Sequence, residues 1–256
     1  MSTTTPAGVT TPATTQRVAI VTGGSRGIGR AVVDRLVADG HAVAIAFAGN
    51  QAAADSAVEA VRAAGGRAIA VRADVADENA VSALFDLVEQ TFGGVDVVVH
   101  AAGRMDLAPL AQLDLDVLDQ LHRTNVRGTF VVDQQAVRRL RSGGALVNFS
   151  SSVIGLAFPG YAAYAASKGA VEAMTLVLAR EVRGRDITVN AVAPGPTATE
   201  LFLEGKDEET LARLAAQPPL ERLGTAEDIA GVVAFLAGPA GRWVNGQVLR
   251  ANGGII

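Results

Sequence analysis

Residues 17–29 read RVAIVTGGSRGIG, a short β-branched run that ends in a cluster of glycines. Apolar residues recur at intervals of three and four from Ile28 to Val37, and Gly40 follows, which is typical of an amphipathic helix closed by a glycine. A strand, a glycine turn and a helix in this order present backbone N–H groups at a helix N-terminus, where they attract phosphate. The stretch predicts a phosphate-binding loop, with a purely structural turn as the alternative. Its expected cofactor-binding residues are Gly23, Ser25, Arg26, Gly27, Ile28 and Gly29.

Strand and helix patterns alternate along the rest of the chain. Apolar runs predict strands over 17–22, 41–47, 68–71, 95–99, 145–149, 187–192 and 247–249. Periodic segments predict helices over 28–37, 51–64, 77–92, 114–140, 161–182 and 226–237, the last preceded by a capping-box pattern at Thr225 and Asp228. We therefore expect a single-domain α/β fold, a Rossmann-like, doubly wound parallel seven-stranded sheet with helices on both faces. Ligands bind such a sheet at the carboxyl ends of its strands.

Two segments look less regular than the rest. Residues 1–16, MSTTTPAGVTTPATTQ, are rich in threonine, proline and alanine and predict a flexible tail before a domain over 17–256. They lack the basic and apolar regions of a secretory signal. Residues 199–219 are polar and charged, which favours a mobile helical lid over the substrate within 197–219.

Composition argues against several classes of function. The 256 residues carry a formal net charge of −4 without a basic cluster, so we expect no nucleic-acid partner. Cysteine is absent, which excludes disulfides and a cysteine nucleophile, and the three histidines are too scattered for a metal cluster. No charge-free apolar run is long enough to span a membrane. We expect no metal, no membrane association and a soluble, cytoplasmic protein.

Residues 151–168, SSVIGLAFPGYAAYAASK, carry three groups suited to carbonyl and alcohol chemistry. Tyr164 and Lys168 stand four apart in a segment of helical composition, so both side chains leave one helix face. An ammonium group favours the phenolate, and we expect Lys168 to lower the pKa of Tyr164 from its usual value of about 10. The strand over 145–149 would deliver the Ser151 hydroxyl beside them. The alternative is an exposed pair of no consequence, since this spacing is common.

The end of the second predicted strand bears on the choice of nucleotide. A carboxylate about 20 residues beyond the glycines would hold the ribose hydroxyls of NAD, but residues 47–50 read FAGN. Nothing there would repel a 2′-phosphate, and Arg26 would pair with one unless it is an ordinary solvated arginine. We therefore expect NADP(H) as the preferred cofactor, with NAD(H) as the alternative.

Together these motifs resemble the short-chain dehydrogenase/reductase family in its single-domain form. They occur in the family's order, as Thr22-Gly23-x3-Gly27-Ile28-Gly29, Asn125, Ser151, Tyr164-x3-Lys168 and Pro194-Gly195. The resemblance covers the chain from Arg17 onward. It implies a catalytic tetrad in which Tyr164 is the general acid and Ser151 binds the substrate carbonyl. Asn125 would kink its helix and hold a water that relays protons from Lys168 to solvent.

The resemblance also implies further contacts with the cofactor. Asp74 would contact the adenine, the backbone around Gly103 would border the adenosine ribose, and Lys168 would bind the nicotinamide ribose. Thr197 and Thr199 would reach the carboxamide and the pyrophosphate. The remaining residues expected to bind the cofactor are Val75, Ala102, Tyr164, Pro194 and Gly195.

Two stretches depart from the family's pattern. His100-Ala101-Ala102-Gly103 stands where the family commonly has Asn-Asn-Ala-Gly, and Asn252-Gly253-Gly254 stands in place of Asp-Gly-Gly. Because the missing amides help to fix the central strands, the first departure puts local stability in question. Neither departure touches the tetrad.

We expect an NADPH-dependent oxidoreductase that reduces a ketone to a secondary alcohol, with Tyr164 as proton donor. The segments TGGSRGIGR, FAGN and LAREV look most like 3-oxoacyl-[acyl-carrier-protein] reductases, so a 3-oxoacyl thioester is a candidate substrate. By the same resemblance, Arg185 and Arg141 would dock the acyl carrier protein. A dehydrogenase of a sugar, steroid or small alcohol stays open, as does a non-catalytic NADP-binding regulator. An epimerase or dehydratase is disfavoured, because those relatives need a larger C-terminal domain.

The family resemblance implies a homotetramer or, less often, a homodimer. Members pack through the helix that carries the tyrosine and lysine and through the C-terminal strand. Val171, Met174, Leu178 and the closing residues 253–256 would suit these contacts, although they would equally serve the core of a monomer.

Overall fold

The computed structural model describes residues 16–256, and seven strands form its central sheet. Their order across the sheet is β3-β2-β1-β4-β5-β6-β7, and every neighbouring pair is parallel. The predicted doubly wound α/β fold is confirmed. The strands are β1 (Val18–Thr22), β2 (Ala42–Phe47), β3 (Ala68–Arg72), β4 (Val95–His100), β5 (Leu140–Phe149), β6 (Thr188–Pro194) and β7 (Val248–Ala251).

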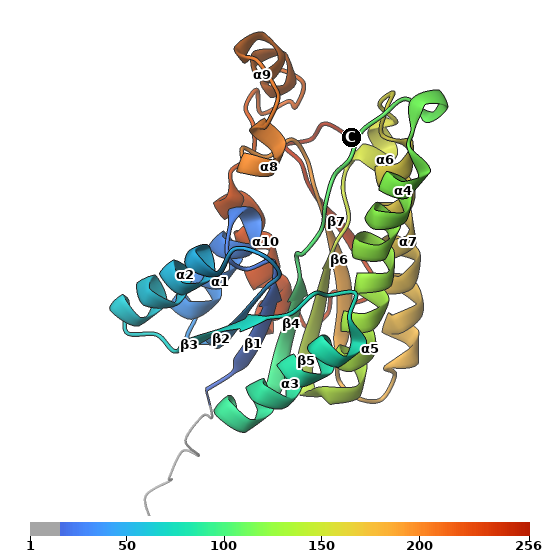
Figure 1. Cartoon of the computed structure of the whole chain (residues 1–256). Coiled ribbons are helices and arrows are strands. Elements are labelled where there is room, and N and C mark those ends of the chain that lie inside the picture. Colours follow the sequence, from blue (N-terminus) through green and yellow to red (C-terminus); the bar gives the residue numbers. More distant parts are fainter. Residues whose placement is uncertain (1–15) are drawn as a thin grey trace, which may run out of the picture.

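The longer helices cover both faces of the sheet (Figure 1). On one face lie α1 (Gly27–Ala38), α2 (Gln51–Ala63) and α10 (Ala226–Ala237), and on the other lie α3 (Glu78–Phe92), α5 (Gly128–Arg139) and α7 (Ala162–Glu181). Side chains of β1 alternate between two apolar clusters, with Ile20 in one and Val21 in the other. No helix among residues 16–256 is long and apolar enough to cross a membrane.

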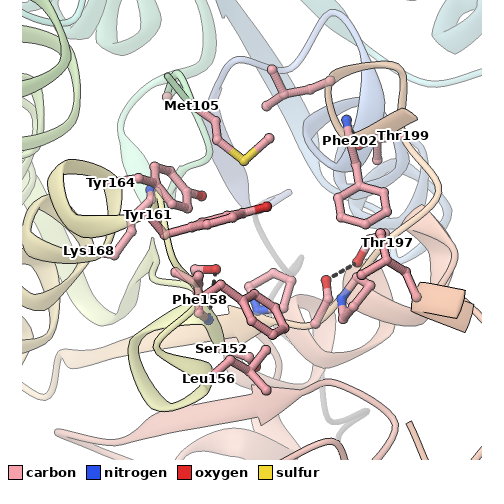
Figure 2. A pocket seen from close by; sticks show the side chains of 18 of the residues that line it. Met105, Ser152, Leu156, Phe158, Tyr161, Tyr164, Lys168, Thr197, Thr199 and Phe202 are labelled. Atoms are coloured by element: carbon pink, nitrogen blue, oxygen red, sulfur yellow. Dashed lines mark hydrogen bonds between the residues drawn. The ribbon is translucent and has the colours of Figure 1, made fainter. Parts of the chain in front are cut away.

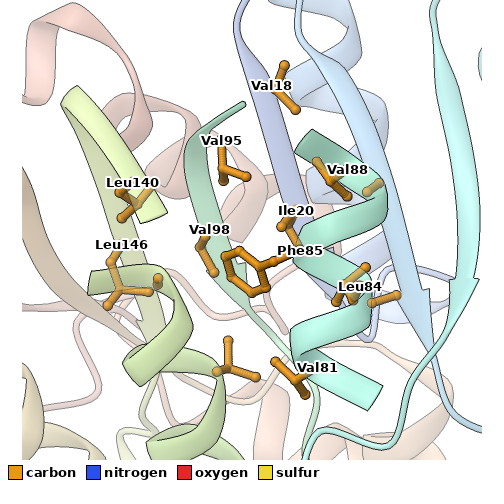
Figure 3. Packing of buried hydrophobic residues seen from close by; sticks show 14 of the residues in the cluster. Val18, Ile20, Val81, Leu84, Phe85, Val88, Val95, Val98, Leu140 and Leu146 are labelled. Carbon is orange, nitrogen blue, oxygen red and sulfur yellow. The ribbon is translucent and has the colours of Figure 1, made fainter. Parts of the chain in front are cut away.

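The core beneath α3 explains why the strands read as continuous apolar runs. Figure 3 shows the ring of Phe85 directed from α3 toward Ile20 of β1 and Val98 of β4. All three side chains are fully buried. Because helices cover both faces of a parallel sheet, alternate residues of one strand are buried on opposite sides. Both sets of positions must then be apolar.

Local signals in the sequence set the beginnings of several helices. The predicted capping box is present at α10, where Thr225 Oγ1 accepts from Asp228 N and Asp228 Oδ2 accepts from Thr225 N. Asn50 caps α2 by accepting a 3.0 Å hydrogen bond from Ala53 N, and Asp77 caps α3 in the same manner. These bonds satisfy N–H groups that have no partner inside the helix.

The long helical segment predicted over 114–140 is interrupted in its middle. Helix α4 (Leu115–His122) is followed by a π-helical turn, η2 (Arg123–Arg127), which leads into α5. Asn125 lies buried within this turn. A π-helical turn is therefore present at Asn125 and shifts the side chains that follow around the helix, while the expected kink stays a prediction.

The carboxyl ends of the strands carry the short elements of the fold (Figure 1). Helix α6 (Val153–Leu156) follows β5, and the predicted lid contains α8 (Glu200–Leu203) and α9 (Glu208–Ala215). The 3₁₀ turn η1 (Leu110–Gln112) follows β4, whereas the 3₁₀ turn η3 (Pro239–Gly241) precedes β7 near the amino ends of the strands. Strands β1 and β4 are neighbours although β2 and β3 come between them in sequence, so the strand order reverses there. Such a reversal leaves a crevice in which nucleotides bind.

The expected tail, residues 1–16, lies outside the described residues except for Gln16. Gln16 Nε2 donates a 3.1 Å hydrogen bond to Gly40 O, and Gln16 Oε1 accepts one of 3.1 Å from Arg67 Nη1. The structured part of the chain therefore begins at least one residue before the predicted boundary at Arg17.

The core makes a direct prediction for stability. Leu84 is 1% exposed and Leu110 is 73% exposed. We expect Leu84→Ala to lower the free energy of unfolding by about 2–5 kcal/mol, because it removes buried apolar surface and leaves a cavity. The matched Leu110→Ala should change it by less than about 0.5 kcal/mol. Urea denaturation of both variants checks this, and equal losses would contradict the burial described here.

Candidate active site

The glycine loop between β1 and α1 contains close contacts that only glycine allows. A Cβ atom at Gly29 would lie 2.2 Å from Gly23 O, and one at Gly23, whose φ is +67°, would lie 2.9 Å from Ala102 N. Arg26 precedes α1 with an extended backbone, makes no side-chain cap, and is followed by a first turn without acidic residues. The open N-terminus of α1 therefore fits the phosphates of a dinucleotide.

A buried polar bridge joins β1 to β4 beside this loop. Thr22 Oγ1 lies 2.8 Å from His100 Nδ1 and accepts a 3.1 Å hydrogen bond from Ala102 N. Burial lowers the pKa of His100 to about 3, with a smaller contribution from the charge of Lys168, so the ring is neutral. His100 thus supplies a cross-strand link at the position where the family commonly has asparagine. This link holds the backbone after β4 against the glycine loop.

The same row of the sheet leads to a buried carboxyl group. His100 is the register partner of Asn148 in β5, and Asn148 Nδ2 donates a 2.8 Å hydrogen bond to Asp133 Oδ2 of α5. Asp133 is 1% exposed and Asn148 is 0% exposed. Burial raises the pKa of Asp133 to about 7, and the bond from Asn148 offsets only part of that rise. Asp133 is therefore protonated at pH values where a free aspartate is ionised.

Asn125 braces the backbone that follows β4. Its Oδ1 accepts a 2.9 Å bond from Arg104 N, while its Nδ2 donates to Arg104 O at 2.9 Å and to Ser167 Oγ at 3.1 Å. A Cβ atom at Gly103 would lie 3.3 Å from Asn125 Oδ1 and 3.6 Å from Lys168 Nζ, so these groups are neighbours. Asn125 thus fixes one wall of the site. Its expected part in holding a relay water stays a prediction.

Ser151, Tyr164 and Lys168 line one cavity of about 530 Å³ at the carboxyl ends of the strands. Figure 2 shows the side chain of Tyr164 directed into this cavity from α7. Lys168 is 6% exposed, and its Nζ donates a 2.9 Å hydrogen bond to Phe149 O at the end of β5. The same Nζ lies 5.7 Å from the centre of the Tyr164 ring. The predicted trio is therefore assembled around one cavity.

Burial controls the ionisation of the tyrosine and the lysine. It raises the pKa of Tyr164 to about 12, and the neighbouring Ser151 hydroxyl offsets part of the rise. It also lowers the pKa of Lys168 to about 8. The expectation that Lys168 lowers the pKa of Tyr164 is wrong for the protein by itself. Lost solvation of the phenolate is the largest cause of the raised pKa, and the amine of Lys168 bonds to the backbone carbonyl of Phe149.

The loop after β6 brings four of the predicted cofactor residues to the same cavity. Thr197 Oγ1 donates a 2.9 Å hydrogen bond to Gly195 O, and Thr199 caps α8 by accepting from Phe202 N. Thr199 also faces the glycine loop, because a Cβ atom at Gly27 would lie 3.7 Å from it. The cavity is lined from this loop by Pro194, Gly195, Thr197 and Thr199 and from the glycine loop by Ile28.

Asp74 and Val75 lie further away, after β3. Asp74 accepts hydrogen bonds from Ala76 N at 2.9 Å and from Arg123 Nη1 at 2.7 Å. These bonds lower the pKa of Asp74 despite the opposing effect of burial. Val75 is buried, and a Cβ atom at Gly128 would lie 2.7 Å from it, so it packs against the start of α5. Neither residue lines the cavity.

The C-terminal departure from the family is also accounted for. Asn252 Nδ2 donates a 3.0 Å hydrogen bond to Ser152 Oγ, and Asn252 Oδ1 accepts one of 3.0 Å from Gly254 N. A carboxylate would make the second bond but has no proton for the first. Asn252 thus ties the end of the chain to the segment that follows β5.

Two arginines expected at the entrance of the site lie elsewhere. Arg141 forms an ion pair with Asp96, with Nη2 2.5 Å from Oδ2, near the beginning of β4 and β5. Arg185 donates to the backbone carbonyls of Val137 and Leu140 in the same region. Both positions are at the amino ends of the strands, opposite Ser151. Within the subunit these arginines therefore lie away from Ser151, and the docking of a carrier protein by them stays a prediction.

Sequence reasoning missed several residues of the cavity wall, including Phe158 and Tyr161. A signal was available in the segment Phe158-Pro159-Gly160-Tyr161, where Pro-Gly predicts a turn directly before the helix. Tyr161 is the N-cap residue of α7, three residues before Tyr164 in the first turn of that helix. Figure 2 shows both aromatic side chains at the cavity.

An open helix N-terminus, a half-buried tyrosine and a buried lysine, set at the crevice of a doubly wound sheet, define a nicotinamide-nucleotide-dependent oxidoreductase. The family model described as "Enoyl-(Acyl carrier protein) reductase" matches residues 23–256. A short-chain type dehydrogenase/reductase of Picea abies is 44% identical over 248 residues, which cover 93% of this chain and 92% of that protein. The chain belongs to the short-chain dehydrogenase/reductase family, and it is an NAD(P)-dependent enzyme that acts on CH–OH groups and carbonyls.

Relatives of known description carry several names. An NADPH-dependent aldehyde reductase-like protein of Arabidopsis thaliana is 40% identical over 254 residues, covering 94% of each chain. A 3-oxoacyl-[acyl-carrier-protein] reductase of Staphylococcus aureus is 38% identical over 239 residues, covering 93% of this chain and 97% of that protein. A short-chain dehydrogenase of Burkholderia cenocepacia, solved in complex with NADP, is 40% identical with a TM-score of 0.88, covering 94% and 98%.

The buried carboxyl group predicts a dependence of stability on pH. The folded pKa of Asp133 is about 7 and its ordinary value is 3.8, so between these values the folded protein holds a proton that the unfolded chain has released. Stability should therefore fall as pH rises from 4 to 7, by up to about 1.4 kcal/mol per pH unit from this group. Asp133→Asn should remove that component.

Urea denaturation at pH 4, 5, 6, 7 and 8 measures the effect as the difference between wild type and Asp133→Asn. The exposed Asp119→Asn is the matched control and should keep the wild-type slope. Parallel pH profiles for wild type and Asp133→Asn would show that Asp133 is ionised in the folded protein and would contradict the prediction.

Proposed function

We propose that this enzyme uses NADPH to reduce a ketone to a secondary alcohol, with Tyr164 as the proton donor. The observation that carries the proposal is the meeting of Tyr164, Lys168 and Ser151 in one cavity beside the open N-terminus of α1. When a carbonyl is reduced its oxygen becomes an alkoxide, and these three groups can hydrogen-bond that oxygen and supply its proton.

The chain's own groups would handle the carbonyl oxygen and the proton. A nicotinamide cofactor supplies the hydride when it is bound. The Ser151 hydroxyl would donate to the carbonyl oxygen, on which negative charge develops. Tyr164 is protonated in the neutral range, since its pKa is about 12, and would give its proton to the same oxygen. Lys168, with a pKa of about 8, exchanges a proton near neutral pH and would restore the phenol.

Several features support NADP(H) over NAD(H). The segment after β2 contains no carboxylate, and the side chain of Asn50 is occupied as the cap of α2. Arg26 is exposed and pairs with Glu200 of the lid at 3.5 Å. Exposed ion pairs of this kind are worth little, so a 2′-phosphate would displace Glu200 readily. The names of the Arabidopsis and Burkholderia relatives point the same way.

The substrate carbonyl is proposed to belong to a ketone or an aldehyde. The name of the Arabidopsis relative supports a free carbonyl compound. A 3-oxoacyl thioester is the second candidate, favoured by the Staphylococcus relative. The position of Arg141 and Arg185 at the far end of the strands weakens the case for a carrier protein. Dehydrogenation of a sugar, a steroid or a small alcohol uses the same groups in reverse.

We also propose a homotetramer, with a homodimer as the alternative. Val171 and Leu178, expected at an interface, pack instead in the core of the subunit. Helices α5 and α7 nevertheless expose Phe130 (56%), Leu176 (50%) and Val177 (54%). Residues near β7 also expose apolar surface, above all Trp243 at 98%. Apolar residues on these two faces suit contacts with further copies of the chain.

Loss of the phenol tests the function most simply. We expect Tyr164→Phe to lower kcat by at least about 100-fold, because general acid catalysis contributes 10²- to 10⁴-fold. NADPH binding and the melting temperature should change little. The assay follows the fall in NADPH absorbance with a panel of ketones, aldehydes and a short 3-oxoacyl thioester, beside NADH as the control cofactor. NADPH should be preferred at least about tenfold, given the strength of a charge-assisted phosphate contact.

Two results would contradict the proposal. Undiminished turnover by Tyr164→Phe would show that Tyr164 is not the proton donor. Tight NADPH binding without turnover of any compound in the panel would favour a non-catalytic NADP-binding regulator instead.

A further inference from the structure

The chain contains two tyrosines, and both line the same cavity. Tyr161 is the N-cap residue of α7 and Tyr164 lies in the first turn of that helix, and Figure 2 shows both side chains at the cavity. Tyr164 accounts for the proton transfer proposed above. Nothing in that mechanism uses the hydroxyl of Tyr161.

The ring of Tyr161 is held in place before any ligand arrives. Tyr161 N donates a 3.2 Å hydrogen bond to Phe158 O, closing a turn with Pro159 at its second position and Gly160 at its third. Gly160 has a φ of +84°, which a type II turn requires there. The rings of Phe158 and Tyr161 meet edge to face, with centres 5.8 Å apart. A ring fixed in this way loses little conformational entropy on binding.

The Tyr161 side chain lies at the cavity (Figure 2), and its hydroxyl makes no hydrogen bond with any of residues 16–256. Tyr161 is half-buried at the cavity wall, and burial raises its pKa, so it is a neutral donor in the working range. A bound molecule in the cavity is the partner that its position allows.

The substrate side of the cavity is largely apolar, and the polar side chains of its wall include Arg104, Lys206, Thr210, Arg213 and Gln217. Of the three basic side chains, Arg104 pairs with Asp106 at 2.6 Å, and Lys206 Nζ lies 4.6 Å from the ring centre of Phe202. The apolar lining consists of Met105, Val153, Leu156, Leu201, Phe202 and Leu214.

We propose that Tyr161 determines specificity by donating a hydrogen bond to a second oxygen of the substrate, next to the carbonyl that Tyr164 protonates. The substrate class is then an aryl ketone with a vicinal carbonyl or hydroxyl group. Its ring packs on the aromatic pair Phe158 and Tyr161, and its two oxygens face the two tyrosines. This inference rests on the proposed reduction of carbonyl compounds.

Three ketones that differ by one oxygen test the proposal. The probe is 1-phenylpropane-1,2-dione, and its matched controls are 1-phenylpropan-1-one and 1-phenylpropan-2-one, each of which lacks one of the two oxygens. In Tyr161→Phe, kcat/KM for the dione should fall about tenfold, which corresponds to about 1.4 kcal/mol for one hydrogen bond. For both monoketones it should stay within about twofold, since only the hydroxyl is removed. NADPH affinity and melting temperature should not change.

A second variant guards against a structural explanation. Phe158→Leu keeps the hydroxyl but removes the ring that fixes it, and should raise KM for the dione about threefold or more while NADPH affinity stays constant. An equal fall for the dione and the monoketones in Tyr161→Phe, or no fall at all, would overturn the role of Tyr161. If the enzyme turned over only thioesters or aliphatic aldehydes, and this turnover required Tyr164, the proposed substrate class would be wrong but the proposed function would stand. If no carbonyl compound were reduced, both the proposed substrate class and the proposed function would be wrong.

Discussion

The site depends on a half-buried phenol and a buried amine on one side of a single helix. Lys168 has lost almost all contact with water, and its ammonium group is anchored to the carbonyl of Phe149 at 2.9 Å. That bond fixes α7 against the end of β5, from which the chain continues directly to Ser151. Buried charge is costly unless it is hydrogen-bonded. This bond therefore joins the helix directly to the strand end that precedes the serine.

The cofactor side of the cavity is fixed by a second set of buried polar groups. Thr22, His100 and Asn148 are register partners across β1, β4 and β5, and Asp133 closes the row from α5. Through Thr22 Oγ1 this row also holds Ala102 N, which lies against the glycine loop. Asn125 braces the next residue but one, Arg104, from the π-helical turn. The buried polar row thus holds the backbone after β4 against the glycine loop, which leads into the open N-terminus of α1.

Much of this arrangement follows from local sequence signals. The strands, the glycine loop and the cap at Thr225 were predictable because each depends on residues that are close in sequence. The pKa of Tyr164 was not, because solvation depends on how deeply α7 is buried in the finished fold. The places of Arg141 and Arg185 likewise depend on which end of the sheet a loop reaches. Tyr161 was missed although its Pro-Gly turn is local, because only the structure brings its ring to the cavity.

The protonation state of Tyr164 is the measurement that tests the central claim most directly. Because the chain has two tyrosines, Tyr161→Phe leaves Tyr164 as the only phenol, and tyrosinate absorbance at 295 nm then reports on it alone. We predict no ionisation of Tyr164 below about pH 10 in the protein without cofactor, since burial raises its pKa. A titration midpoint between pH 7 and 9 would contradict this, because Tyr164 would then be partly ionised near neutral pH and would be a poorer proton donor.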